Sequence, residues 1–185
     1  MHSETSKKPV VGKLAMLWGL GGLAVVLSDA SLRLSRHLID AWSYDWSIAQ
    51  WTLFIVNTAF MAYSEGYRGF QKSFVPRVVA RAFYLRDNPT AFRALLAPLF
   101  VVGYFAAPKR TRMVVFIGTA LIVIAVILIR QLPQPWRGII DAGVVLGLSW
   151  GVISLALISL SALRSGKPPM PHQVPDGDAK EQINE

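Results

Sequence analysis

The sequence predicts an all-α integral membrane protein, built as a compact bundle of transmembrane helices. Three observations carry this prediction. Hydrophobic residues make up 53% of the 185 residues and charged residues only 16%, whereas a typical soluble domain has about 25% charged residues. The apolar residues form continuous runs rather than amphipathic stripes. Most Lys and Arg residues flank these runs, and they leave a net charge of +8.

The composition also excludes several classes of function. The chain has no cysteine, which excludes disulfides, thiolate catalysis and Cys-ligated metals. Its three histidines, His2, His37 and His172, are too scattered to predict a multi-histidine metal or haem site. We therefore expect no metal and no cofactor. Because the basic residues border apolar runs, anionic lipid headgroups are the expected partner rather than nucleic acid.

A basic tail, residues 1–13, precedes the first apolar run, residues 14–27. A run of this length is also typical of a signal peptide, and residues 28–30 resemble a small-residue cleavage site. Cleavage of residues 1–30 is therefore an alternative. A retained helix is favoured because residues 31–41 continue the helical spacing of apolar side chains.

The second apolar run, residues 47–63, is near the lower length limit for a spanning helix. Aromatic side chains of the kind that settle at a membrane interface surround its start, namely Trp42, Tyr44, Trp46 and Trp51. Beyond the run, Gly66 and Gly69 are expected to permit a bend where the chain leaves the membrane.

The basic segment that follows is predicted to hold an interfacial helix over residues 76–87, beginning at Pro76. Its apolar side chains alternate with Arg77, Arg81 and Arg86. Cations on such a helix commonly contact anionic headgroups, so these three arginines are the predicted lipid-headgroup residues.

Three further apolar runs follow, at residues 94–107, 113–129 and 138–163. The first of them contains Pro98 and is short, a length typical of a re-entrant segment. The other two are long enough to span a membrane. The membrane domain is thus predicted to cover residues 14–164, and the proline-rich residues 165–185 are expected to form a disordered tail.

The distribution of basic residues favours four spans plus a re-entrant segment over five spans. If residues 94–107 enter and return, 15 of the 19 Lys and Arg residues share the side of the N-terminus, against 11 if they cross. The positive-inside rule then places the N-terminus in the cytoplasm, and a bacterial inner membrane is the expected location. Five spans remain an alternative, because a helix over residues 89–107 would reach about 28 Å.

Glycines recur at one face of the last apolar run, at Gly143, Gly147 and Gly151. Small residues four apart let another helix approach closely. We interpret them as helix-packing residues, which pack inside the chain's own bundle or, in the functional alternative, form an oligomer or partner-docking face.

Three polar residues are candidates for a polar pathway. Asn57 lies near the middle of the second run, where its amide needs a hydrogen-bond partner. Glu65 and Asp141 each border an apolar run, and carboxylates in membranes often mark ion pathways. The alternative is local pairing, with Arg68 and Arg137 respectively.

No nucleotide-binding loop, zinc-protease motif or nucleophile elbow occurs, so no catalytic residue is predicted. The expected role is a non-enzymatic membrane subunit or assembly factor that binds its partner through the glycine face. A small oligomeric channel or carrier is the alternative. A lipid-modifying enzyme that uses Glu65 or Asp141 is the least favoured.

Overall fold

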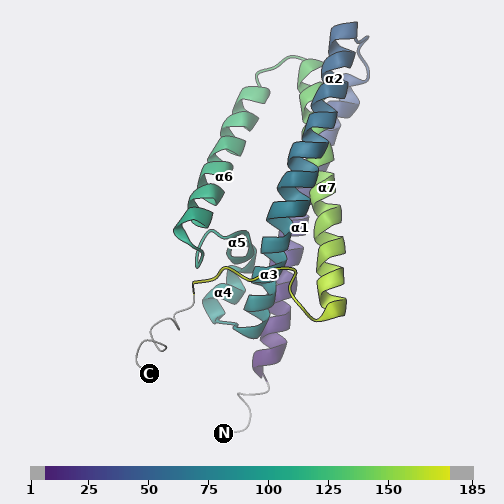
Figure 1. Cartoon of the computed structure of the whole chain (residues 1–185). Helices are drawn as coiled ribbons and strands as arrows, with labels where there is room; N and C mark the ends of the chain where they lie inside the picture. The colour runs from purple at the N-terminus through teal and green to yellow at the C-terminus, as the bar shows by residue number, and fades with distance from the viewer. Residues whose placement is uncertain (1–6, 176–185) are drawn as a thin grey trace.

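The computed structural model describes residues 7–175, and every regular element in that range is a helix. Three helices are long and apolar enough to cross a membrane: α1 (Lys7–Ala41), α6 (Lys109–Ile129) and α7 (Trp136–Ser165). The predicted all-α class is confirmed. Helix α1 begins and α7 ends at the same end of the bundle (Figure 1), which we call the terminal end. The opposite end, where α1 ends and α7 begins, is called the far end.

The two longest helices, α1 and α7, pack against each other in antiparallel directions. Helix α1 has 35 residues and is therefore about 52 Å long. It runs through residues 28–30 without a break. Near the far end, Ala41 of α1 and Ile139 of α7 are fully buried. The hydroxyls of Ser31 and Ser149 lie 3.1 Å apart and join the same two helices.

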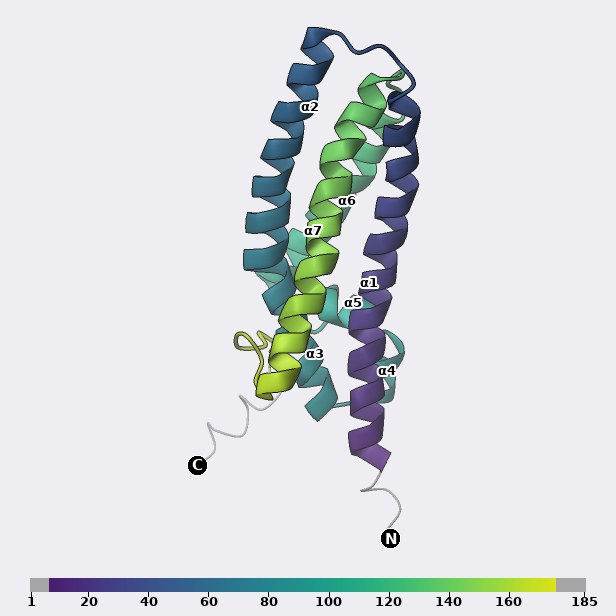
Figure 2. The ribbon, with the colours of Figure 1, turned by 90° about the vertical axis from the view of Figure 1, so that its right-hand side faces the viewer.

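The second long segment is continuous and consists of α2 (Ile48–Met61), the π-helix η1 (Ala62–Phe74) and α3 (Val75–Asp87). A capping box begins it, because the Ser47 side chain accepts from the Gln50 backbone and the Gln50 side chain accepts from the Ser47 backbone. Gly66 and Gly69, which we expect to permit a bend, lie within this helical segment. The chain stays helical there and only widens, as i→i+5 bonding requires. Figure 2 shows α7 lying between this segment and α1.

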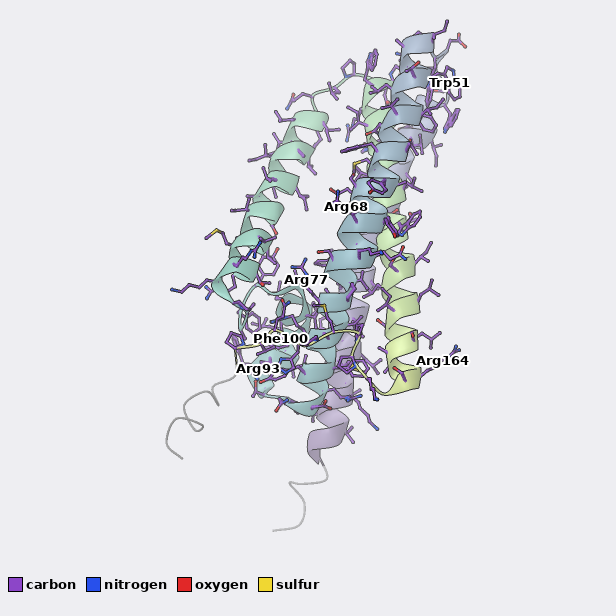
Figure 3. The ribbon with its side chains drawn as sticks, in the orientation of Figure 1. Trp51, Arg68, Arg77, Arg93, Phe100 and Arg164 are labelled. Atoms are coloured by element: carbon purple, nitrogen blue, oxygen red, sulfur yellow. The ribbon has the colours of Figure 1, made fainter. Side chains whose placement is uncertain are left out.

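The aromatic cluster surrounds the turn between α1 and α2. The rings of Trp42 and Trp46 stack with centroids 4.7 Å apart, and Trp46 lies 4.8 Å from Trp51. The Trp46 indole donates to the Ala41 carbonyl and closes the end of α1. Trp51 marks this far end of the bundle in Figure 3.

Helix α3 lies in the core, and the prediction of a basic interfacial helix over residues 76–87 is not confirmed. The helix exists, with Pro76 in its first turn. However, α1, α5 and α7 surround it, and Val75, Val79 and Leu85 are fully buried. An interfacial helix would leave one face exposed to headgroups, but most positions of α3 are covered by protein.

The apolar run at residues 94–107 forms two short helices, α4 (Ala91–Leu95) and α5 (Ala97–Val102). Leu96 leaves the helical conformation between them, with φ −96° and ψ 29°. Gly103 ends α5 with a positive φ of 105°, a conformation that glycine adopts without strain. Both helices lie at the terminal end beside α3 (Figure 1).

Helix α6 stands apart from the other helices (Figure 1). None of its 21 residues is buried. It contacts the remainder of the chain near its start, where Thr111 and Val115 adjoin Gly103 and the hydroxyls of Tyr104 and Thr119 lie 2.6 Å apart. Most of its other side chains are exposed.

Residues 166–175 leave α7 at Gly166, whose φ is 70°, and return across α3. Val174 is buried in the core, and the His172 ring packs on Tyr84 with centroids 4.5 Å apart. These residues of the tail expected over residues 165–185 therefore lie against the core without helix or strand. The tail residues 176–185 and the N-terminal residues 1–6 lie outside the described range.

Candidate functional site

The glycine face of α7 packs against α2 and η1 of the same chain. A Cβ on Gly143 would lie 2.5 Å from Asn57 Nδ2, and one on Gly151 would lie 2.8 Å from the Phe70 ring. A Cβ on Gly147 would lie 3.2 Å from Glu65 Cβ. The glycines therefore allow this internal helix contact, and helices of the same chain occupy the face that a docking partner would need.

Asn57 joins α2 to the beginning of α7. Its Nδ2 donates to the carbonyl of Ile139 at 3.0 Å and to that of Ile140 at 3.2 Å. This is the hydrogen-bond partner that an amide in an apolar run requires. The amide thus has a structural partner inside the bundle.

At the far end of the bundle, α1 and α7 bring together His37, Arg137 and Asp141. His37 Nδ1 lies 2.8 Å from Asp141 Oδ2, and an Arg137 N–H donates to His37 Nε2 at 2.9 Å. Arg137 Nε is 3.8 Å from the same Asp141 oxygen. Asp141 is only 2% exposed. The imidazole therefore bridges a buried carboxylate and a guanidinium.

Gln134 fixes this cluster to the backbone. Its side-chain amide donates to the His37 carbonyl at 3.1 Å, and its oxygen accepts from the Gly138 N–H at 3.2 Å. His37 was not predicted as the partner of Asp141, because Asp141 was paired only with Arg137 of its own helix. The antiparallel course of α1 and α7 was the available signal, since it places the end of one helix beside the start of the other.

Glu65 does not join Asn57 and Asp141 in a common site. It is exposed on η1, whereas Asp141 faces His37 of α1 and Asn57 faces the α7 backbone. Two open cavities of about 300 and 360 Å³ lie beside α3 and α7, and none of the three residues lines either. The structure therefore does not bring the predicted polar-pathway residues together.

Arg81 is not a lipid-headgroup residue, which corrects the prediction made for it. It is 3% exposed, and its guanidinium donates to the carbonyls of Phe100, Phe105 and Ala106 at 2.8–3.0 Å. It also lies over the Phe100 ring, 4.4 Å from the centroid. Burial lowers the pKa of Arg81 to about 10, so it stays charged at neutral pH. The side chain holds the turn after α5 against α3.

The other two predicted headgroup residues differ from each other. Arg86 forms a two-point pair with Asp87, at 2.7 and 3.1 Å, and this pair raises the pKa of Arg86. Arg77 has no carboxylate partner among the described residues. Its guanidinium donates instead to the carbonyl and hydroxyl of Ser73. Arg81 is buried and Arg86 is paired with a carboxylate. Arg77 is therefore the one of the three arginines whose charge is best placed to contact an anionic headgroup.

No protein-family model, no curated protein and no solved structure matches this chain. Within residues 7–175, no group of three or more His, Asp or Glu side chains could hold a metal ion.

Proposed function

We propose that the chain is a non-enzymatic subunit or assembly factor of a membrane complex, and that α6 binds a transmembrane helix of its partner. One observation carries the proposal: α6 buries none of its residues, whereas α1, α3 and α7 all contribute to the core. A helix that is apolar all round must be covered by lipid or by other helices. Residues 113–129 hold no charged side chain, so the covering helix is itself apolar.

The surface of α6 has a pattern suited to a neighbouring helix. Small side chains recur every seven residues, at Thr111, Gly118 and Ala125, and of these Thr111 already packs against Gly103 of the same chain. Small residues in membrane helices let a second backbone approach closely, and a seven-residue repeat is the spacing of left-handed helix pairs. A Cβ on Gly118 would meet no atom within 4 Å, so the bundle itself does not use this opening.

The proposed topology has four spans: α1, the α2–η1 segment, α6 and α7. The segment containing α4 and α5 would enter and return, because both helices stay at the terminal end (Figure 1). The break at Leu96 and the turn at Gly103 support this topology over a fifth crossing. It places 15 of the 19 Lys and Arg residues on the side of the N-terminus, which favours a cytoplasmic terminal end and a bacterial inner membrane.

Two other roles have weaker support. A channel or carrier would need Asn57, Glu65 and Asp141 to line one path. Asn57 instead contacts the backbone of α7, Asp141 contacts His37, and Glu65 is exposed on η1. A lipid-modifying enzyme would gain an acid–base pair in His37 and Asp141. In that pair, however, His37 Nε2 accepts a hydrogen bond from Arg137, so the nitrogen that would take a substrate proton is already occupied.

The proposal is tested by purifying the tagged chain from its native membrane in mild detergent and measuring the composition by mass spectrometry. We expect an integral membrane protein at fixed stoichiometry. Gly118→Leu should lower its recovery on the order of tenfold or more, as blocking the centre of an interface does. Gly21→Leu is the matched control, because a Cβ on Gly21 of α1 also meets no atom within 4 Å.

Recovery of the chain alone, or with lipid only, would contradict the subunit role. Equal recovery of the partner with Gly118→Leu and the wild type would contradict the docking role of α6. Equal losses with Gly118→Leu and Gly21→Leu would contradict that role too, because the loss would then not be specific to α6.

A further inference from the structure

A row of basic side chains follows the η1–α3 segment, formed by Arg68, Lys72 and Arg77. Arg68 and Lys72 are four residues apart within η1, about one turn of a helix bonded i→i+5, and Arg77 follows in the first turn of α3. Figure 3 shows Arg68 and Arg77 on the side of this segment that is turned towards α6. Arg68 and Lys72 are exposed, and Arg77 is half-buried.

Two of these cations, Arg77 and Lys72, have contacts with neighbouring side chains, and none of the three is paired with a carboxylate of residues 7–175. Arg77 donates to Ser73 twice, at 2.9 and 3.2 Å, which uses two of the five N–H groups of its guanidinium. Lys72 Nζ lies 5.0 Å from the centroid of the Tyr67 ring. Across the described residues, no carboxylate oxygen lies within 4.0 Å of any of the three cations.

The row begins close to the start of α6, an apolar helix. Arg81, one turn beyond Arg77, bonds to the turn at Phe105 and Ala106, which immediately precedes α6. Since α6 runs antiparallel to α3 (Figure 1), Arg77, Lys72 and Arg68 lie successively further along it. Cations at that depth need an anionic partner or must extend to the interface.

We propose that Arg68, Lys72 and Arg77 bind the phosphate of an anionic phospholipid whose acyl chains lie along α6. The basic row supplies the charge complementarity, and the exposed apolar side chains of α6 supply a surface along which the acyl chains can lie. Basic pockets between membrane helices on the cytoplasmic side commonly bind such headgroups. Further exposed cations, Lys109, Arg110 and Arg112, begin α6 and add to the positive potential at this end.

This site does not depend on the proposed protein partner. Its cations belong to η1 and α3, whereas the proposed partner contact is centred on Gly118 of α6. Lipid binding is measured on the purified chain alone, and partner binding on the native complex, so either proposal can fail without the other.

The test measures phosphatidylglycerol that remains bound to the purified full-length chain after exchange into phosphatidylcholine micelles, by native mass spectrometry. The site variant is Arg68→Gln/Lys72→Gln/Arg77→Gln. Its matched control, Arg36→Gln/Arg130→Gln/Arg164→Gln, removes the same charge from exposed positions elsewhere. We expect the site variant to lose roughly a hundredfold in phosphatidylglycerol affinity, about fivefold for each cation. We expect the control to lose little.

A conservative variant, Arg68→Lys/Arg77→Lys, keeps the positive charge and should retain most of the binding, which shows that a loss in the glutamine variant is not misfolding. Inorganic phosphate is added as a competitor and should not displace the lipid. Equal losses in the site and control variants would overturn the proposal, since binding would then reflect net charge. Displacement by inorganic phosphate would also overturn it, because the site would then take a free anion.

Discussion

The amide of Asn57 occupies the space where a side chain on residue 143 would lie. Asn57 Nδ2 would be 2.5 Å from a Cβ on Gly143, and the same nitrogen donates to the carbonyls of Ile139 and Ile140. The glycine thus allows a polar side chain from α2 to reach the backbone of α7. The two residues form one contact, and each should affect the other's contribution to stability.

Gly143→Ala should destabilise the folded chain by about 1–3 kcal/mol, because the added methyl displaces the Asn57 amide. Asn57→Ala removes the hydrogen bonds and should cost about 0.6–2 kcal/mol, the range for such bonds between membrane helices. The double variant should cost less than the sum, with a coupling of about 0.5–3 kcal/mol. Unfolding in mixed micelles measures all three values.

Gly21→Ala serves as the control for this pair, because a Cβ there meets no atom within 4 Å. It should leave stability unchanged or raise it slightly, as alanine favours helix. Additive effects of Gly143→Ala and Asn57→Ala would show that the contact does not exist.

The far-end cluster predicts a large difference between two aspartates. Asp141 is 2% exposed and paired with His37, whereas Asp29 and Arg33 form an exposed pair one turn apart on α1. Asp141→Asn should cost about 3 kcal/mol or more, because it removes one partner of a buried pair. Asp29→Asn should cost less than about 1 kcal/mol. Similar losses for the two variants would contradict the burial of the cluster.

Arg81 should hold the turn between α5 and α6. Arg81→Met leaves the carbonyls of Phe100, Phe105 and Ala106 without their hydrogen-bond donors. Each unsatisfied carbonyl should destabilise the folded chain by about 1–3 kcal/mol. The measurable result is faster trypsin cleavage at Lys109 and Arg110. Arg81→Lys should be cleaved at an intermediate rate, because an ammonium lacks the planar fork. Unchanged cleavage in both variants would show that the turn is held by other contacts.

The charge on Arg81 also predicts how stability depends on pH. Burial lowers the pKa of Arg81 to about 10, so the unfolded chain binds this proton more tightly than the folded chain. The cost of the buried charge is therefore constant below a pH of about 10 and is relieved only above it. The Tm difference between the wild type and Arg81→Met should be equal at about pH 6 and about pH 8.

Local features of the fold could be predicted from the sequence because they depend on nearby residues. Pro98 and the shortness of residues 94–107 indicated a segment that does not form one long helix, and α4 and α5 are separate. The glycine spacing correctly indicated a close helix contact. Spacing cannot say whose helix approaches, however, and the partner is Asn57 and Phe70 of the same chain.

Features that depend on distant residues could not be predicted in this way. The arginines of α3 indicated an exposed helix, but Arg81 satisfies its charge on carbonyls of a turn that only tertiary structure brings near. His37 and Asp141 are 104 residues apart. The residues of α6 do not indicate that this helix stands apart from the bundle, because an apolar helix has the same composition whether or not a neighbouring helix covers it.

The most direct test of the central claim is site-specific photo-crosslinking in intact membranes. A photoreactive residue replaces Ile122 of α6, which is 65% exposed, or Leu157 of α7, which is 63% exposed. We predict that position 122 crosslinks to one membrane polypeptide that also co-purifies stoichiometrically, that Gly118→Leu abolishes this crosslink, and that position 157 gives none to that protein. Only lipid adducts at position 122, in the wild type as in Gly118→Leu, would contradict the claim that α6 binds a partner helix.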